Sequence, residues 1–270
     1  MVAIHVTEHT VKPGSHTTVF LASGPADGPL IVFGHGWPEL SISWRHQLPC
    51  MASLGFRAIA PDMRGYGRSS VYDQHSQYAQ ELIVAAMIHL LDALGRDQAI
   101  WVGHDWGSPV VWNLASHHPD RCAAVANLCV PYYTLERGLE ACVALVDRHM
   151  YPVEQYPAGN WEYQLFYQEH FARATAVMEA NIYNTVKLFF RKGNPAGQRQ
   201  PSATARVRSD GGWFNGAGAA PALPRDPDVV TEEDLCAYTS ALERNGFFGP
   251  NSYEWSSCAA SSDNDTVADW

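Results

Sequence analysis

Hydrophobic and polar positions alternate near the start of the chain and then give way to short, mostly apolar runs. Residues 4–11 and 17–22 alternate with a period of two, which predicts two antiparallel strands joined by a turn at residues 12–15. Four later runs are mostly apolar, and the first of them is continuously so, as in a strand that is buried on both faces of a parallel sheet. These runs are residues 30–33, 56–60, 100–103 and 123–130.

Segments with the apolar spacing of helices lie between these strands, at residues 44–54, 77–94 and 108–118. Alternation of strands and helices predicts the α/β class, with a mostly parallel sheet and helices on both of its faces.

The pattern changes after Pro131. Aromatic-rich helical segments are predicted at 135–149, 161–170 and 175–191, and a further helix starts after Thr231 as N-cap, with acidic residues in its first turn. We therefore expect a core at residues 1–131, a helical cap or lid at 132–250, and a remnant with an unpatterned tail at 251–270.

One strand–turn–helix junction carries the clearest candidate chemistry. The apolar run at 100–103 ends in Gly103-His104-Asp105-Trp106-Gly107, and a helical pattern follows at once. Small residues two positions to either side relieve the crowding of a sharp nucleophile elbow. A carboxylate at its tip can attack carbon, and the helix N-terminus is expected to favour the ionised form. An Asp that only caps the helix is the alternative interpretation.

Two other loops follow predicted strands. The first, Gly34-His35-Gly36-Trp37-Pro38-Glu39, is glycine-rich, and its Trp37 N–H is a candidate for an oxyanion hole. The second begins at Asp62 and ends at Ser69; it lacks the ending of a phosphate-binding loop, so we expect a structural loop held by Asp62 with Arg64 or Arg68.

The net charge, the apolar segments and the cysteine spacing limit the classes of partner and the locations that are expected for the protein. A net charge of -10 disfavours nucleic acid and anionic membrane surfaces, and no segment is long and apolar enough to span a bilayer. The 6 cysteines show no Cys-x-x-Cys spacing, and no secretory signal precedes residue 10, so a cytoplasmic location is expected. No cofactor is expected, and no metal-ligand spacing is found.

These motifs, in this order, resemble those of an epoxide hydrolase of the α/β-hydrolase superfamily. The resemblance rests on residues 35–39, 62–70 and 103–107, and on cap segments at 161–165 and 230–254 that include Phe247-Phe248-Gly249-Pro250-Asn251. It implies an α/β-hydrolase fold with an inserted helical cap, acting on a small apolar epoxide.

The resemblance also implies roles for individual residues. Asp105 is the nucleophile, the backbone N–H groups of Trp37 and Trp106 form the oxyanion hole, and the Tyr163 and Tyr238 phenols hydrogen-bond the epoxide oxygen. The supporting positions are His35, Gly36, Pro38, Gly103, His104 and Gly107. In the second position of the elbow, His104 should point away from the pocket.

The sequence departs from the family after the cap. The family hydrolyses its alkyl ester with a His and an orienting acid on two further strands, whereas the last histidine here is His170. We therefore expect the last two core strands, the base and its acid to be missing. His149 and His170 lie in the predicted cap, and His117 and His118 end a helix.

Three functional interpretations follow. The first is an epoxide hydrolase-like enzyme whose ester hydrolysis is impaired. The second is a non-catalytic relative that is alkylated once at Asp105. The third is a haloalkane dehalogenase-like hydrolase, which would have Asn where Trp37 stands. A serine esterase is excluded because Asp105 cannot form its acyl intermediate. The oligomeric state does not follow from these patterns.

Overall fold

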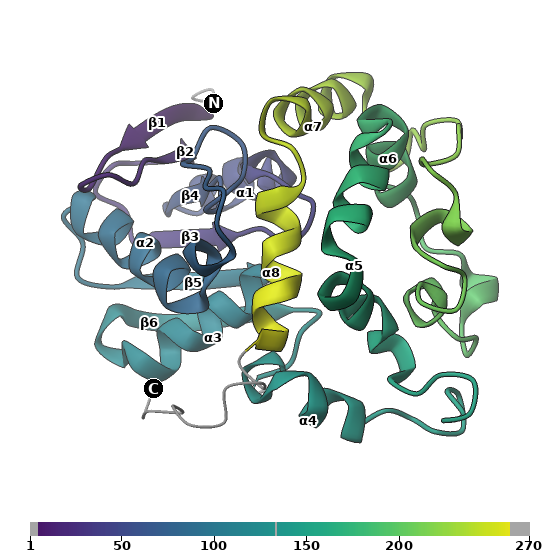
Figure 1. The fold of residues 1–270 in the computed structure, drawn as a ribbon. Helices are drawn as coiled ribbons and strands as arrows, with labels where there is room; N and C mark the ends of the chain where they lie inside the picture. The colour runs from purple at the N-terminus through teal and green to yellow at the C-terminus, as the bar shows by residue number, and fades with distance from the viewer. Residues whose placement is uncertain (1–4, 133, 260–270) are drawn as a thin grey trace. The chain divides into compact units, whose positions relative to one another are not determined.

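The chain folds into two compact units that meet in sequence near residue 133. The computed structural model describes residues 5–132, here called the sheet unit, and residues 134–259, here called the helical unit. Each unit is described by itself (Figure 1).

The sheet unit is built on six strands in the order β1-β2-β4-β3-β5-β6. Strands β1 and β2 are antiparallel, β2 also runs antiparallel to β4, and the remaining pairs are parallel. This is the mostly parallel α/β sheet that the alternation of strand and helix patterns predicted. The strands are β1 (Thr7–Val11), β2 (Thr18–Ser23), β3 (Leu30–Gly34), β4 (Arg57–Pro61), β5 (Ala99–His104) and β6 (Cys122–Leu128).

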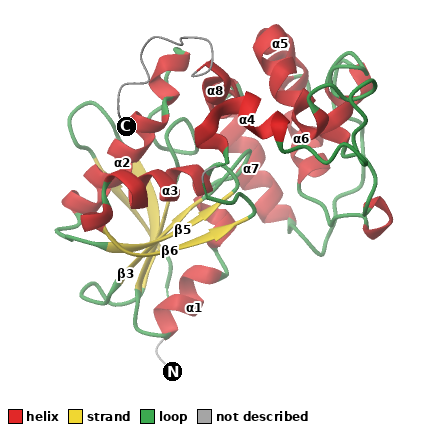
Figure 2. Cartoon of the chain, turned by 90° about the horizontal axis from the view of Figure 1, so that it is seen from below, coloured by secondary structure: helices red, strands yellow, loops and turns green. Residues whose placement is uncertain are grey.

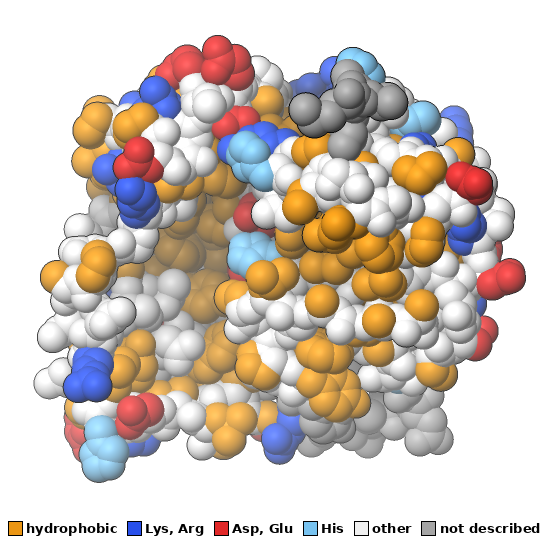
Figure 3. Space-filling view, turned by 180° about the vertical axis from the view of Figure 1, so that it is seen from behind, with side chains coloured by type: hydrophobic (Ala, Val, Ile, Leu, Met, Phe, Trp, Pro, Cys, Tyr) orange, Lys and Arg blue, Asp and Glu red, His pale blue; other side chains and the backbone are white. Residues whose placement is uncertain are grey.

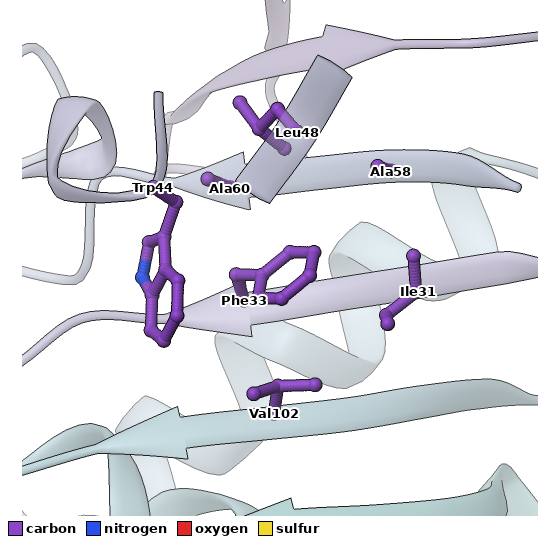
Figure 4. Close-up of a cluster of buried hydrophobic side chains, with 7 residues drawn as sticks. All are labelled: Ile31, Phe33, Trp44, Leu48, Ala58, Ala60 and Val102. Atoms are coloured by element: carbon purple, nitrogen blue, oxygen red, sulfur yellow. The ribbon is translucent and has the colours of Figure 1, made fainter. Parts of the chain in front are cut away.

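Helices cover both faces of this sheet. Figure 2 shows α2 (Gln80–Ala93) and α3 (Gly107–His117) over one face and α1 (Gln47–Ser53) over the other. On the α1 face, alternate residues of β3, β4 and β5 pack beneath Trp44 and Leu48 (Figure 4). Because the helices cover both faces of the sheet, both sets of alternating residues in these strands are mostly apolar.

The helical unit contains no strand in its described residues. Within it α5 packs against α8, and α6 packs against α7. The expected start of α7 is confirmed, since Thr231 and Asp234 form a reciprocal capping box. The helices are α4 (Gly138–Ala144), α5 (Glu162–Glu179), α6 (Ile182–Phe189), α7 (Glu232–Asn245) and α8 (Phe248–Ala259).

Short 3-10 turns connect these elements. In the sheet unit they are Ser41–Trp44, His75–Tyr78 and Pro119–Arg121, and in the helical unit Leu135–Arg137, Gly159–Trp161, Pro195–Gly197, Ala203–Arg206 and Trp213–Gly216. Among the described residues, no helix has the length and apolarity needed to cross a membrane.

Three boundaries in the helical unit differ from the prediction. The helix expected at 135–149 ends at Ala144, because the Arg148 guanidinium donates to the carbonyls of Tyr156 and Pro157 and stabilises a turn. The break expected after His170 is a kink inside α5, where His170 has φ -139° and ψ 38°. The helix expected at 175–191 is divided between the end of α5 at Glu179 and α6, which begins at Ile182.

Part of the segment expected as a remnant and tail at 251–270 is helical, since α8 runs from Phe248 to Ala259. Phe247 and Tyr253 are fully buried, and this packing outweighs the weak helix propensity of Gly249 and Pro250. Proline is tolerated here because it lies in the first turn of the helix, where its missing N–H has no partner to lose. The rest of the expected tail lies outside the described residues.

Candidate active site

Asp105 lies at the tip of a sharp turn between β5 and α3. Its backbone is left-handed, with φ 51°, a conformation that non-glycine residues rarely adopt. The flanking glycines permit this turn: a Cβ on Gly103 would lie 2.4 Å from the Gly107 carbonyl oxygen, and one on Gly107 would lie 2.3 Å from the Gly34 carbonyl oxygen. The turn therefore holds an aspartate at the carboxyl end of a central strand.

Backbone N–H groups hold the carboxylate. The Trp37 N–H donates to Asp105 Oδ1 over 2.7 Å, and the Trp106 N–H also lowers the pKa of this carboxyl group. Burial has the larger effect, however, and the pKa of Asp105 lies above its usual value. The expectation that the helix N-terminus favours the ionised form is thus outweighed, because the carboxyl group is surrounded by protein atoms.

The loop after β3 brings Trp37 to this position. A Cβ on Gly36 would lie 2.3 Å from Asp105 Cβ, so only glycine allows this approach. The neighbouring His35 is buried, and burial lowers its pKa. Its Nε2 accepts from the Met63 N–H at 2.9 Å and its Nδ1 donates to the Gly36 carbonyl at 2.9 Å, so a neutral ring joins two loops.

Glu39 is a site residue that the sequence analysis did not single out. Its Oε2 accepts from the Gly36 N–H at 2.8 Å and lies 3.2 Å from His104 Nδ1. Burial raises the pKa of Glu39, but the hydrogen bonds with His104 and Gly36 leave it below its usual value. The same bond to Glu39 raises the pKa of His104.

His104 and Glu39 open onto a small hollow of about 150 Å³ on the α1 side of the sheet. Its other lining residues are Ser43, Trp44, Gln47 and Leu128.

The loop that begins at Asp62 is held differently from the expectation. Asp62 accepts from the backbone N–H groups of Ser41 and Arg68, each at 3.0 Å. The Arg68 side chain instead pairs with Glu8. Arg64 donates to both the carbonyl and the side chain of Gln77. Asp62 therefore stabilises the loop through backbone donors, because both guanidinium groups have partners elsewhere.

The two candidate phenols belong to the helical unit. Tyr163 lies on α5, where its ring contacts those of Trp161, Tyr167 and Trp213. Tyr238 lies on α7, buried against Phe190 with ring centroids 4.3 Å apart. The structure thus places each phenol in an aromatic cluster. That they face Asp105, which belongs to the sheet unit, stays a prediction.

The two candidate histidines of the helical unit, His149 and His170, are both exposed. The His170 ring lies against Phe166, with centroids 5.2 Å apart.

A family model described as the alpha/beta hydrolase fold matches residues 29–219. The chain therefore belongs to the α/β-hydrolase fold family, as the sheet and the strand–turn–helix junction indicate. Within this family it is similar to epoxide hydrolases, so the resemblance inferred from the motifs is confirmed.

The similarities extend over most of the chain. It is 38% identical over 241 residues to bifunctional epoxide hydrolase 2 of Sus scrofa, which aligns 89% of this chain with 40% of that protein. It is 33% identical over 248 residues to epoxide hydrolase A of Mycobacterium tuberculosis, covering 90% of this chain and 71% of that protein. The crystal structure of epoxide hydrolase A from Mycobacterium thermoresistibile superposes with a TM-score of 0.75 at 30% identity, covering 94% of this chain and 76% of that chain.

The chain thus spans 40% of the length of the mammalian relatives that it matches.

Proposed function

We propose that this chain opens a small apolar epoxide through nucleophilic attack by Asp105. The observation that carries the proposal is the position of the carboxylate, at the tip of a left-handed turn with the Trp37 N–H donating to one of its oxygens. Donors on one oxygen fix the orientation of the group and can stabilise charge that develops there during acyl chemistry. The similarity to epoxide hydrolases supports the same substrate class.

In the first step, a carboxylate oxygen of Asp105 forms a bond to one epoxide carbon as the bond from that carbon to the epoxide oxygen breaks. The released alkoxide takes a proton from the phenol of Tyr163 or Tyr238. A tyrosine is protonated at neutral pH and can donate as negative charge develops on the leaving oxygen. The product is a hydroxyalkyl ester of Asp105, and the tyrosinate regains its proton from water.

In the second step, water must attack the ester carbonyl, and the N–H groups of Trp37 and Trp106 would stabilise the resulting oxyanion. This attack needs a base to remove a proton from the water. The two histidines beside this site already have partners: the His35 ring joins the Met63 N–H to the Gly36 carbonyl, and His104 contacts Glu39. We therefore propose that this polypeptide forms the ester faster than it hydrolyses it, and accumulates as the alkylated protein.

A haloalkane substrate is the less favoured choice. In dehalogenases the residue after the His-Gly pair would be an Asn that binds the halide, whereas Trp37 stands here and offers its backbone N–H to Asp105.

The test is intact-mass spectrometry of the protein after incubation with styrene oxide. We expect one adduct with the mass of one epoxide, located on Asp105 by peptide mapping, and little diol. Asp105→Asn should abolish the adduct. Asp27→Asn, which changes an exposed carboxylate of the same unit, should leave it unchanged.

Sustained diol formation with no accumulated adduct would refute the stalled second step while leaving attack by Asp105 intact. An adduct that persists in Asp105→Asn would refute the nucleophile itself. Release of bromide from 1-bromobutane, faster than reaction with styrene oxide, would favour the dehalogenase alternative.

A further inference from the structure

One arginine of the helical unit binds two glutamates of α5 at once. Arg208 Nε and Nη2 donate to the two carboxylate oxygens of Glu169, at 3.0 Å and 2.7 Å, and its Nη1 donates to Glu162 Oε2 at 3.1 Å. A guanidinium group can bind both carboxylates in this way because its donors form a planar fork, whereas a lysine offers a single point charge. Arg208 therefore attaches the segment that carries it to two positions on one face of α5.

This ion pair differs from an ordinary surface pair because one of its carboxylates is buried. Figure 3 shows acidic and basic side chains interspersed over the face that it views, and most exposed pairs contribute little to stability. Glu162, in contrast, is only 3% exposed, and its other oxygen accepts from the Ala158 N–H at 2.6 Å. Removal of the Arg208 guanidinium would leave a buried negative charge without this cation, which favours a shift of Glu162 towards water.

The buried glutamate is also the residue before one of the candidate phenols. Glu162 and Tyr163 are the first two residues of α5, so a displacement of Glu162 moves the backbone of Tyr163 with it. The Tyr163 side chain is half-buried and stacks on Trp161, with ring centroids 6.5 Å apart. The direction of the phenol therefore depends on how the first turn of α5 is held.

The segment that carries Arg208 supports the phenol a second time, through a ring contact. The Gly212 N–H donates to the Val207 carbonyl at 2.7 Å and closes a turn that contains Arg208. Trp213 follows this turn directly and is only 9% exposed. Its ring centroid lies 6.1 Å from that of Tyr163, in an edge-to-face contact. A displacement of the Arg208 turn would therefore also move the ring that packs against Tyr163.

We propose that Arg208 is a positioning residue for the Tyr163 phenol. It acts through Glu162, which precedes Tyr163 on α5, and through Trp213, which packs on the Tyr163 ring. This inference rests on the proposed function, in which the phenol of Tyr163 or Tyr238 gives a proton to the alkoxide as the epoxide opens. A proton donor must lie within hydrogen-bond reach of the leaving oxygen, so a displaced phenol slows ring opening more than it weakens epoxide binding.

The rate of adduct formation with styrene oxide, measured by intact mass at several epoxide concentrations, tests the proposal. In Arg208→Ala the maximal rate should fall at least ~10-fold, while the epoxide concentration that gives half of this rate should change less than ~3-fold. Arg208→Lys keeps the charge without the fork, and its maximal rate should lie between those of Arg208→Ala and the unmodified protein.

Arg206→Ala is the matched control. It removes an exposed arginine of the same segment, which pairs with Asp210 at 4.0 Å instead of with α5. Both quantities should change less than ~2-fold, because exposed pairs of this kind contribute little. An equal fall of the maximal rate in Arg206→Ala and Arg208→Ala overturns the proposal.

A Tyr163→Phe background separates positioning of this phenol from a general loss of structure. Tyr238 is the phenol that remains, and a slower reaction is expected there. In this background Arg208→Ala should change the maximal rate less than ~2-fold, because there is no Tyr163 hydroxyl left to misplace. An equal fall in both backgrounds overturns the proposal, since Arg208 would then act on the protein as a whole.

A second measurement does not need the reaction. Fluorine NMR of the protein labelled with fluorotyrosine gives a signal for Tyr163, which is assigned by its loss in Tyr163→Phe. Arg208→Ala should shift this signal, and Arg206→Ala should not. The signals of Tyr72 and Tyr78, which belong to the sheet unit, should stay unchanged in both variants.

The two measurements distinguish failure of this inference from failure of the proposed function. If the unmodified protein forms no adduct, the proposed function fails, and the fluorine signal alone decides the role of Arg208. An unchanged Tyr163 signal in Arg208→Ala overturns the inference with or without reaction. A shifted signal with an unchanged rate of alkylation also overturns it, because the position of this phenol would then not limit ring opening.

Discussion

At the scale of single residues, the candidate site depends on small side chains as much as on the acid. Asp105 can sit beside the Trp37 N–H only because Gly36 and Gly103 leave room for the neighbouring backbone. The spacing of the elbow predicted the role of Gly103, and the glycine-rich loop at 34–39 predicted a close backbone approach at Gly36. The sequence did not predict Glu39, because the role of that residue arises from a loop folding back on itself.

Gly36→Ala should therefore slow the alkylation of Asp105 by styrene oxide at least ~100-fold, because a small misplacement of reacting groups is sufficient for such a loss. The added Cβ would lie 2.3 Å from Asp105 Cβ and would push the loop and the nucleophile apart. The measurement is the single-turnover rate of adduct formation by intact mass.

Gly193→Ala is the control for this variant, because nothing lies within 4 Å of the position where its Cβ would be. Its alkylation rate should equal that of the unmodified protein. An unchanged rate in Gly36→Ala would show that the close approach of the two loops is not needed for attack.

At the scale of elements, packing decides where helices begin and end. The period of apolar residues predicted the strands and helices of the sheet unit well, because those segments are long and lie on one core. It failed at α8, whose first turn contains Gly249 and Pro250. This helix forms because Asn251 and Tyr253 are buried and because α8 packs against α5.

Asn251 is the residue that tests this account of α8. Its Nδ2 donates to Thr175 Oγ1 at 3.1 Å, and its Oδ1 accepts from the Tyr167 hydroxyl at 3.3 Å. Asn251→Ala should lower the free energy of unfolding by about 2–3 kcal/mol, because it leaves the buried Tyr167 hydroxyl and the half-buried Thr175 hydroxyl without these partners. Urea unfolding followed by circular dichroism measures the change.

Gln168→Ala removes a side chain of similar polarity from an exposed position on α5, the helix that Asn251 contacts, and should change the stability by less than about 0.5 kcal/mol. Equal stability of the two variants would contradict the importance of the contact between α5 and α8.

At the scale of the whole molecule, stability depends on pH through a buried histidine in the sheet unit. His16 Nδ1 lies 3.0 Å from the Tyr72 hydroxyl and 3.1 Å from Arg64 Nη1. Burial, and then the positive charge of Arg64, lower its pKa from 6.5 to about 4. Between these values the unfolded chain binds a proton that the folded chain does not.

The free energy of unfolding should therefore fall as the pH is lowered from 6.5 to 4, by at most about 3 kcal/mol from this residue. His16→Gln keeps an acceptor for Arg64 but cannot be protonated, so its loss of stability between pH 7.5 and pH 4.5 should be smaller. Urea unfolding at the two pH values provides the comparison.

His46→Gln, which changes an exposed histidine in the same unit, should keep the pH dependence of the unmodified protein. If His16→Gln and His46→Gln lose the same stability on acidification, another group is responsible for the loss.

The sequence by itself determined the class of the fold, the succession of strands and helices along the chain, and the identity of the candidate nucleophile. These depend on local spacing: a period of two in strands, a helical period between them, and two glycines flanking Asp105.

Only the tertiary structure decided which groups meet. It placed Glu39 on His104, turned Arg64 and Arg68 away from Asp62, and made burial, rather than the helix N-terminus, set the direction of the Asp105 pKa shift. Such effects depend on neighbours distant in sequence, and on the water that they exclude, which no local pattern contains.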